Sequence, residues 1–162
     1  MKRLIPIFLA IVCLCSCKGG EIKPHITGIS FTAELTYFNE IYIMEAQIDK
    51  DATLTARIKE PEAIKDLNLT VNDKDITAEY LGLKYEANEA TLPFSKTIWD
   101  AYLPLRHIIS SGAVANNNGI LEGQTENLKY RLAVSPTGLP QSLELTNRKL
   151  GIRFYNIEIK EE

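Results

Sequence analysis

The strongest constraint on this chain is a two-residue alternation of apolar and polar side chains that begins near residue 29. In residues 29–37, apolar side chains occupy nearly every second position, and Ser, Thr and Glu fill the positions between. The alternation returns in residues 42–48 and 52–58, after short polar turns. A period of two places neighbouring side chains on opposite faces of a β-strand. We therefore predict three consecutive antiparallel strands joined by tight turns.

The remaining chain continues this β pattern, with one short break. Pro61 begins a helical turn, because proline fits the first helical position. Strands are then expected at 67–71 and 76–86, and three more after residue 128, which makes about eight in all. The apolar phase flips between Phe154 and Tyr155, which predicts a β-bulge or burial on both faces.

Residues 92–112 have a helical period instead. Pro104 predicts a kink or a split in this helix, and Gly112 is a plausible end. The fold class predicted for residues 26–162 is mainly β (α+β): a curved antiparallel sheet, or incomplete β-barrel, with a helix packed on its concave face. The helix presents an apolar stripe of Ile98, Tyr102, Leu105 and Ile109, with Trp99 beside it.

Composition and motifs narrow the possible functions. The 162 residues are 45% hydrophobic with a formal net charge of -3, which suits one globular domain and argues against nucleic-acid binding. The two histidines, His25 and His107, are not in a metal-ligand spacing. No nucleophile elbow or glycine-rich phosphate loop is present. We expect a non-catalytic protein with no metal and no cofactor.

The N-terminus has the features of a secretory signal. Lys2 and Arg3 precede eleven apolar residues, 4–14, too few to span a bilayer as a helix. All three cysteines lie at 13, 15 and 17, without the spacing of a zinc or dithiol motif. The alternative is an uncleaved membrane anchor.

Leu14-Cys15-Ser16-Cys17 resembles the bacterial lipobox. The resemblance implies a signal peptide at 1–16, cleavage between Ser16 and Cys17, and a diacylglyceryl group with palmitate-type chains on Cys17. Residues 17–25 would then be a short flexible tether. The protein would be a lipoprotein anchored on the extracytoplasmic face of the cell membrane.

Three longer passages resemble the LolA-type lipoprotein carrier superfamily. They are "ARIKEPEAIKDLNLTV", the pair "YLGLKYE" and "LPFSKTIWDAYLPL", and "YRLAVSPTGLPQSLEL" followed by "IRFYNIEI". Asp66 stands where the first passage usually has glycine. The resemblance implies an incomplete barrel around a helical lid, with an apolar cavity that takes the acyl chains of lipoproteins or glycolipids.

Two functions follow from these observations. The first is a half-barrel that binds a lipid, an acyl chain or a lipidated protein. The second is a cell-envelope interaction or sensor protein with a closed core and a protein partner, because the helical stripe suits ordinary packing equally well. For the first, the candidate apolar groove consists of Phe31, Leu35, Phe94, Ile98, Trp99, Tyr102, Leu105 and Ile109.

Overall fold

The fold is a single sheet crossed by one long helix. The structure is a computed structural model that describes residues 20–73, 75–87 and 93–160. Its helical elements are the 3-10 turn η1 (Glu62–Ile64) and the helix α2 (Pro93–Ser111). Its strands are β1 (Ile29–Tyr37), β2 (Glu40–Ile48), β3 (Leu54–Glu60), β4 (Asn68–Val71), β5 (Ile76–Tyr80), β6 (Leu83–Ala87), β7 (Ile120–Gln124), β8 (Lys129–Val134), β9 (Pro140–Leu145) and β10 (Leu150–Ile159).

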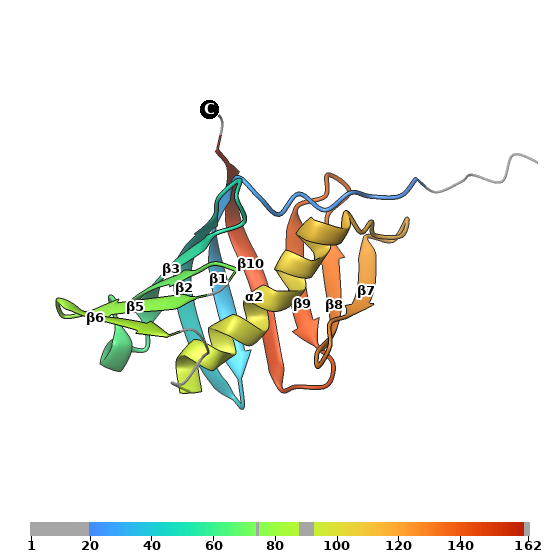
Figure 1. Cartoon of the computed structure of the whole chain (residues 1–162). Helices are drawn as coiled ribbons and strands as arrows, with labels where there is room; N and C mark the ends of the chain where they lie inside the picture. Colours follow the sequence, from blue (N-terminus) through green and yellow to red (C-terminus); the bar gives the residue numbers. More distant parts are fainter. Residues whose placement is uncertain (1–19, 74, 88–92, 161–162) are drawn as a thin grey trace, which may run out of the picture.

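All ten strands form one antiparallel sheet in the order β6-β5-β4-β3-β2-β1-β10-β9-β8-β7. Among the described strands, the outer pair β6 and β7 are not hydrogen-bonded to each other, so the sheet stays open. The sheet curves around α2, which runs diagonally across its concave face (Figure 1). The predicted curved antiparallel sheet with a helix on its concave face is confirmed.

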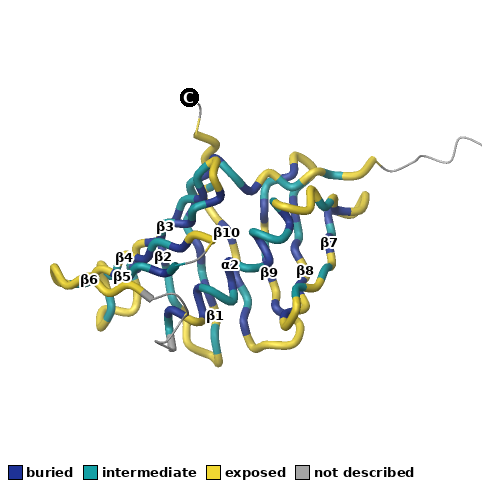
Figure 2. Tube along the Cα trace, viewed as in Figure 1, coloured by how far each residue is buried: buried dark blue, intermediate teal, exposed yellow. Residues whose placement is uncertain are grey.

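The alternation that predicts the strands also determines which side chains are buried. Along β1, buried and partly exposed residues alternate from Ile29 to Leu35, as one strand face turned toward a core requires. Phe38 and Asn39 both adopt positive φ, at 47° and 74°, and form the tight turn into β2. Buried positions line the inner side of most of the sheet (Figure 2).

Two strands depart from the expectation. Residues 76–86 are not one strand but the hairpin β5–β6, which turns at Leu81 and Gly82, both with positive φ. The local signs of this turn are Gly82 and a flip of apolar phase between Tyr80 and Leu81. The strand β7 was not predicted, because Gly123 interrupts its short apolar pattern. A Cβ atom at Gly123 would lie 2.2 Å from the Tyr130 hydroxyl, so the close approach of this ring excludes a side chain.

The helix is continuous through Pro104, so the predicted split does not occur. It ends at Ser111, and Gly112 has the positive φ (64°) of a common helix C-terminal cap. Its buried face runs through Ile108, whereas Ile109 is only partly buried. The predicted stripe is therefore displaced by one residue at its last turn.

The predicted irregularity in β10 is a bulge. The pairing of β10 with β1 shifts register between Tyr155 and Glu158, and Asn156 has a positive φ of 47°. The extra residue changes which side chains face inward, which explains the flip in apolar phase.

The chain before β1 contacts the domain. Ile22 and Ala115 exchange two backbone hydrogen bonds of 3.0 and 2.8 Å, and the His25 amide donates to the Gly138 carbonyl at 2.8 Å. The sequence suggested a flexible tether for 17–25. From residue 22 onward this segment instead lies along the domain, because its backbone groups pair with two loops.

Candidate functional site

The space between α2 and the concave face is the predicted groove. We call it the helix–sheet interior. It is lined by apolar side chains of α2, β1, β2, β3 and β10, and no polar surface is exposed in it. Its free volume is about 20 Å³. That is room for about one water molecule, so side chains nearly fill it.

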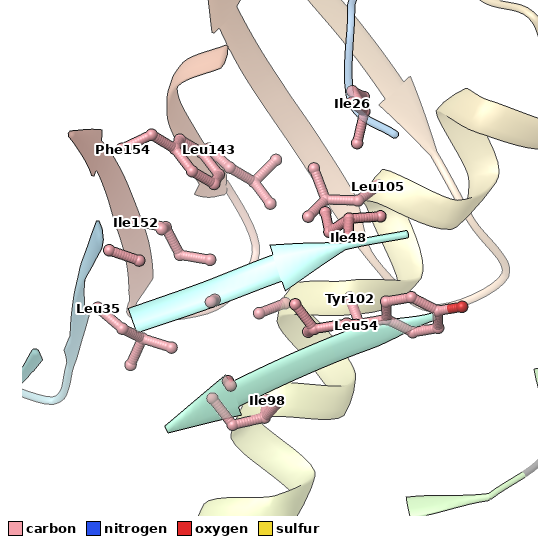
Figure 3. Close-up of a cluster of buried hydrophobic side chains, with 14 of the residues drawn as sticks. Ile26, Leu35, Ile48, Leu54, Ile98, Tyr102, Leu105, Leu143, Ile152 and Phe154 are labelled. Atoms are coloured by element: carbon pink, nitrogen blue, oxygen red, sulfur yellow. The ribbon is translucent and has the colours of Figure 1, made fainter. Parts of the chain in front are cut away.

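Sequence-predicted groove residues meet in this interior. Ile98, Tyr102 and Leu105 of α2 point toward the strands, with Leu35 and Ile152 on the sheet side (Figure 3). The lining also includes Phe31 of β1, whose ring meets that of Phe154 edge-on at 5.2 Å. Small side chains lie beneath the helix as well, and Ala46 of β2 is paired directly with Ala56 of β3.

The other three predicted groove residues lie outside the interior. Phe94 packs against Tyr42 with ring centroids 4.7 Å apart, at the first turn of α2. Trp99 lines a different hollow, together with residues 125–128 of the β7–β8 turn. Ile109 lies near the N-terminal segment, in a shallow hollow with Pro24. Cys17 and Ser16 lie outside the described residues.

The second half of α2 is tied to the sheet by polar contacts. The Tyr102 hydroxyl donates to the Ala52 carbonyl oxygen at 2.9 Å. The Arg106 Nε lies 2.6 Å from a carboxylate oxygen of Asp73, in the turn between β4 and β5. His107 Nδ1 lies 2.8 Å from the Tyr130 hydroxyl. These contacts fix the helix from Tyr102 toward its C-terminus.

Burial also affects the tyrosines of this region. It raises the pKa of Tyr102, and the nearby Asp73 carboxylate acts in the same direction, because both disfavour a phenolate. Burial likewise raises the pKa of Tyr130. Tyr42, near the first turn of α2, donates to the Glu40 carboxylate at 2.5 Å, and this hydrogen bond is the main reason that its pKa is raised to about 12.

A larger hollow opens where the helix–sheet interior ends, and we call it the mouth hollow. It has a volume of about 470 Å³ and lies between the first half of α2 and the hairpin ends of β1 and β10. Tyr37, Phe38 and Leu150 give it an apolar side. Its charged groups are Lys96, Asp100, Arg148 and Lys149.

A second hollow, of about 480 Å³, lies on the other side of the same half of α2. It shares Lys96, Asp100 and Arg148 with the mouth hollow and adds Trp99 and Glu126. The first half of α2 therefore has open space on both sides, with cations in each. The sequence contains no sign of this cluster, since Lys96 and Arg148 are far apart in the chain and neither belongs to a motif.

Neither a metal-binding cluster nor a membrane-spanning helix is found in the part of the chain that the structure describes. In residues 20–73, 75–87 and 93–160, no three His, Cys, Asp or Glu side chains are grouped as a metal site would require. Across the same part of the chain, no helix combines the length and apolar character needed to cross a membrane.

Comparison with known proteins identifies the fold. No protein-family model and no curated protein matches the sequence. A solved structure of an uncharacterized conserved protein from Thermus thermophilus is similar, with 8% identity and a TM-score of 0.52. The similarity covers 85% of this chain and 81% of that one. The open sheet with its helix is thus a fold found in a solved protein.

A LolA superfamily protein from Nitrosomonas europaea is also similar, with 6% identity and a TM-score of 0.38. The similarity covers 83% of this chain and 86% of that one. The sequence passages described above resemble the same superfamily. At this TM-score it carries no information about a ligand or about the role of any residue.

Proposed function

We propose that this chain is a membrane-anchored lipoprotein whose half-barrel binds an acyl chain, free or attached to another molecule, between α2 and the concave face. The role is non-catalytic. The observation that carries the proposal is the wholly apolar lining of the helix–sheet interior. An acyl chain has no hydrogen-bonding groups along its length, so it can replace the contacts of α2 without leaving buried polar groups unpaired.

The apolar inner face also extends beyond the helix. Leu83 and Tyr85 of β6 pair with Tyr80 and Ala78 of β5, so they share the inner face. They are 77% and 45% exposed. The sheet therefore offers more apolar surface than α2 covers, as expected for a face that also receives a ligand.

Binding of an acyl chain requires α2 to move. Ligand pockets usually have volumes of about 300–1,000 Å³, whereas the interior has about 20 Å³. Pro104 has no amide hydrogen to donate within the helix, which makes a weak point near its middle. The polar contacts of Tyr102, Arg106 and His107 hold the second half in place. We infer that the first half, 93–101, swings outward.

The membrane anchor is the second part of the proposal, and it rests on the lipobox-like residues 14–17. Replacement of Cys17 by Ala is expected to abolish acyl labelling and to release the protein from the membrane or leave an unprocessed precursor. Metabolic labelling with a clickable fatty acid, followed by membrane fractionation, measures both effects. Normal labelling of the variant would move the site to Cys15 or Cys13. Cys15→Ala is the matched control.

The nearly filled interior favours a second candidate, a cell-envelope interaction or sensor lipoprotein with a closed core. In that case α2 is a permanent part of the core, and the ligand is a protein that binds outside. The two functions differ in one respect that can be measured: whether an acyl chain ever contacts the residues lining the helix–sheet interior.

Photochemical labelling measures this contact. The full chain in lipid nanodiscs is irradiated with a fatty acid that carries a photoreactive group near its end, and the labelled peptides are identified by mass spectrometry. Acyl binding predicts label on peptides that contain residues 98–105 and 31–35. A closed core predicts that these peptides remain unlabelled.

A pair of alanine variants provides the control. Ala46→Leu adds volume inside the interior and is expected to reduce its labelling strongly. It also costs about 1–3 kcal/mol of folding free energy, as overpacking usually does. Ala133→Leu makes the same change on β8, where Ala133 lies between the buried Leu132 and Val134 and faces outward. It should leave the labelling unchanged. Equal labelling of both variants would contradict acyl binding in the interior.

A further inference from the structure

We propose that the mouth hollow binds an anionic headgroup, a carboxylate or a phosphate, of the lipid whose chain enters the helix–sheet interior. This inference rests on the proposed acyl binding and adds to it the chemical class of the ligand. It is drawn from the position, the charge and the apolar side of the hollow.

The hollow continues the interior along three elements. On β1 the lining passes from Leu35 in the interior to Tyr37 in the hollow, and on β10 from Ile152 to Leu150. On α2, Ile98 lines the interior and its neighbour Thr97 lines the hollow. Tyr37 and Leu150 are also paired directly across β1 and β10. An acyl chain that lies along this path has its polar end in the hollow.

The charge of the hollow is opposite in sign to that of the whole chain. Lys96, Arg148 and Lys149 line it against the single carboxylate of Asp100, whereas the whole chain carries a formal charge of -3. Three cations in one concave site attract an anion, because the low-dielectric walls focus their field. A neutral headgroup would not account for this local excess.

The cations are available for a ligand. Among the described residues, the Arg148 guanidinium has no hydrogen bond and no ion pair from its side chain, and the residue is exposed. The Lys96 ammonium lies 3.7 Å from the Asp100 carboxylate, at the long end of an ion pair, and its side chain is 56% exposed. The planar guanidinium of Arg148 can therefore donate two parallel hydrogen bonds to two oxygens of one carboxylate or phosphate. Lys96 adds a second positive charge.

The aromatic side of the hollow suits the atoms next to the headgroup. Phe38 is 57% exposed, and the Lys149 ammonium lies 5.6 Å from the centre of its ring. Phe38 and Tyr37 also contact each other edge-on, with ring centroids 4.7 Å apart. The hollow thus has both cations and an aromatic surface in its lining, as binding of an amphiphile requires. Its volume of about 470 Å³ is sufficient for a headgroup and the first carbons of a chain.

Three photoreactive probes with identical tails test the inference: a fatty acid, a monoalkyl phosphate and a fatty alcohol. Each is added to the full chain in nanodiscs of neutral lipid, and label on the interior peptides is measured. We expect at least about tenfold more label from one or both anionic probes than from the alcohol, the effect of a hydrogen bond to a charged group. The relative yield of the fatty acid and the alkyl phosphate distinguishes carboxylate from phosphate as the source.

Charge reversal provides the matched variants. The double variant Lys96→Glu/Arg148→Glu is expected to reduce anionic labelling about tenfold or more and to leave alcohol labelling unchanged. The control Lys65→Glu/Arg153→Glu makes the same change at two exposed sites outside the hollow. This control variant should change neither the anionic labelling nor the alcohol labelling. Anionic labelling of the unmodified chain should also fall as salt is raised from 50 to 500 mM, because salt screens exposed charges.

The outcomes separate the two proposals. Equal labelling of the interior by all three probes overturns the anionic headgroup and leaves acyl binding intact. Charge reversal that reduces all three probes equally also overturns it, since the effect is then not on the headgroup. If no probe labels the interior, acyl binding fails and the headgroup assignment fails with it.

Discussion

The helix–sheet interior and the mouth hollow lie next to each other on the same three elements, yet they are built in opposite ways. The interior is apolar and nearly filled, with about 20 Å³ free, and the hollow has about 470 Å³ with four charged side chains. Buried apolar contacts dominate folding stability, whereas exposed charges contribute little to it. In the proposal, the interior both stabilises the fold and receives the acyl chain, whereas the hollow binds the headgroup and adds little to stability.

The largest expected effect separates the two regions by stability. Leu105 is 3% exposed and packs between α2 and the sheet. Its replacement by Ala removes buried carbon and leaves a cavity, so we expect unfolding free energy to fall by about 2–5 kcal/mol. Lys149→Ala in the hollow should change it by less than about 0.5 kcal/mol. Urea unfolding followed by circular dichroism measures both. Similar losses in the two variants would mean that the hollow is part of the core.

Sequence patterns predicted the elements that create these regions, because each pattern is local. The alternation of β1 and the helical period around Ile98 and Leu105 follow directly from which faces are buried. The hairpin at Gly82 and the strand around Gly123 were missed, since glycine contributes no apolar side chain to a pattern.

The hollow could not be predicted in the same way. It exists because β10 pairs with β1, which brings Leu150 opposite Tyr37. The turn before β10 then carries Arg148 toward Lys96 of α2. Such a meeting depends on the topology of the whole sheet. The free volume of the interior could not be predicted from the sequence either, because it depends on how individual side chains pack against one another.

A smaller effect shows whether polar contacts or packing hold the helix. Tyr102 is 1% exposed, and its hydroxyl donates to the Ala52 carbonyl at 2.9 Å. Tyr102→Phe keeps the ring and removes the hydrogen bond, so we expect a loss of about 0.5–1.5 kcal/mol. The exposed Tyr155→Phe is the control and should be nearly neutral. Because the proposed movement of α2 is confined to residues 93–101, Tyr102→Phe should leave labelling of the interior by the photoreactive fatty acid unchanged.

Increased labelling would instead mean that the moving part of α2 extends to Tyr102, so that the interior opens when this contact is weakened. Unchanged labelling, together with the expected loss of stability, would mean that the Tyr102 contact lies outside the part of α2 that moves. Labelling that falls in the variant would argue against a mobile helix.

The smallest expected effect is at alkaline pH. Burial raises the pKa of Tyr102 above its ordinary value, which is close to that of the unfolded chain, about 10. The folded state therefore favours the neutral phenol. The resulting contribution to stability is complete below about pH 10 and declines as pH rises above that value, since the unfolded chain then releases its proton first.

Phenolate absorbance should show this tyrosine titrating above pH 10, and Tyr102→Phe should remove that step. Because Tyr42 also titrates late, with a pKa of about 12, the difference between the two proteins isolates the buried phenol. If that difference instead shows Tyr102 titrating at its ordinary value, the interior admits water at this position, and the distinction between a sealed interior and an open hollow does not hold there.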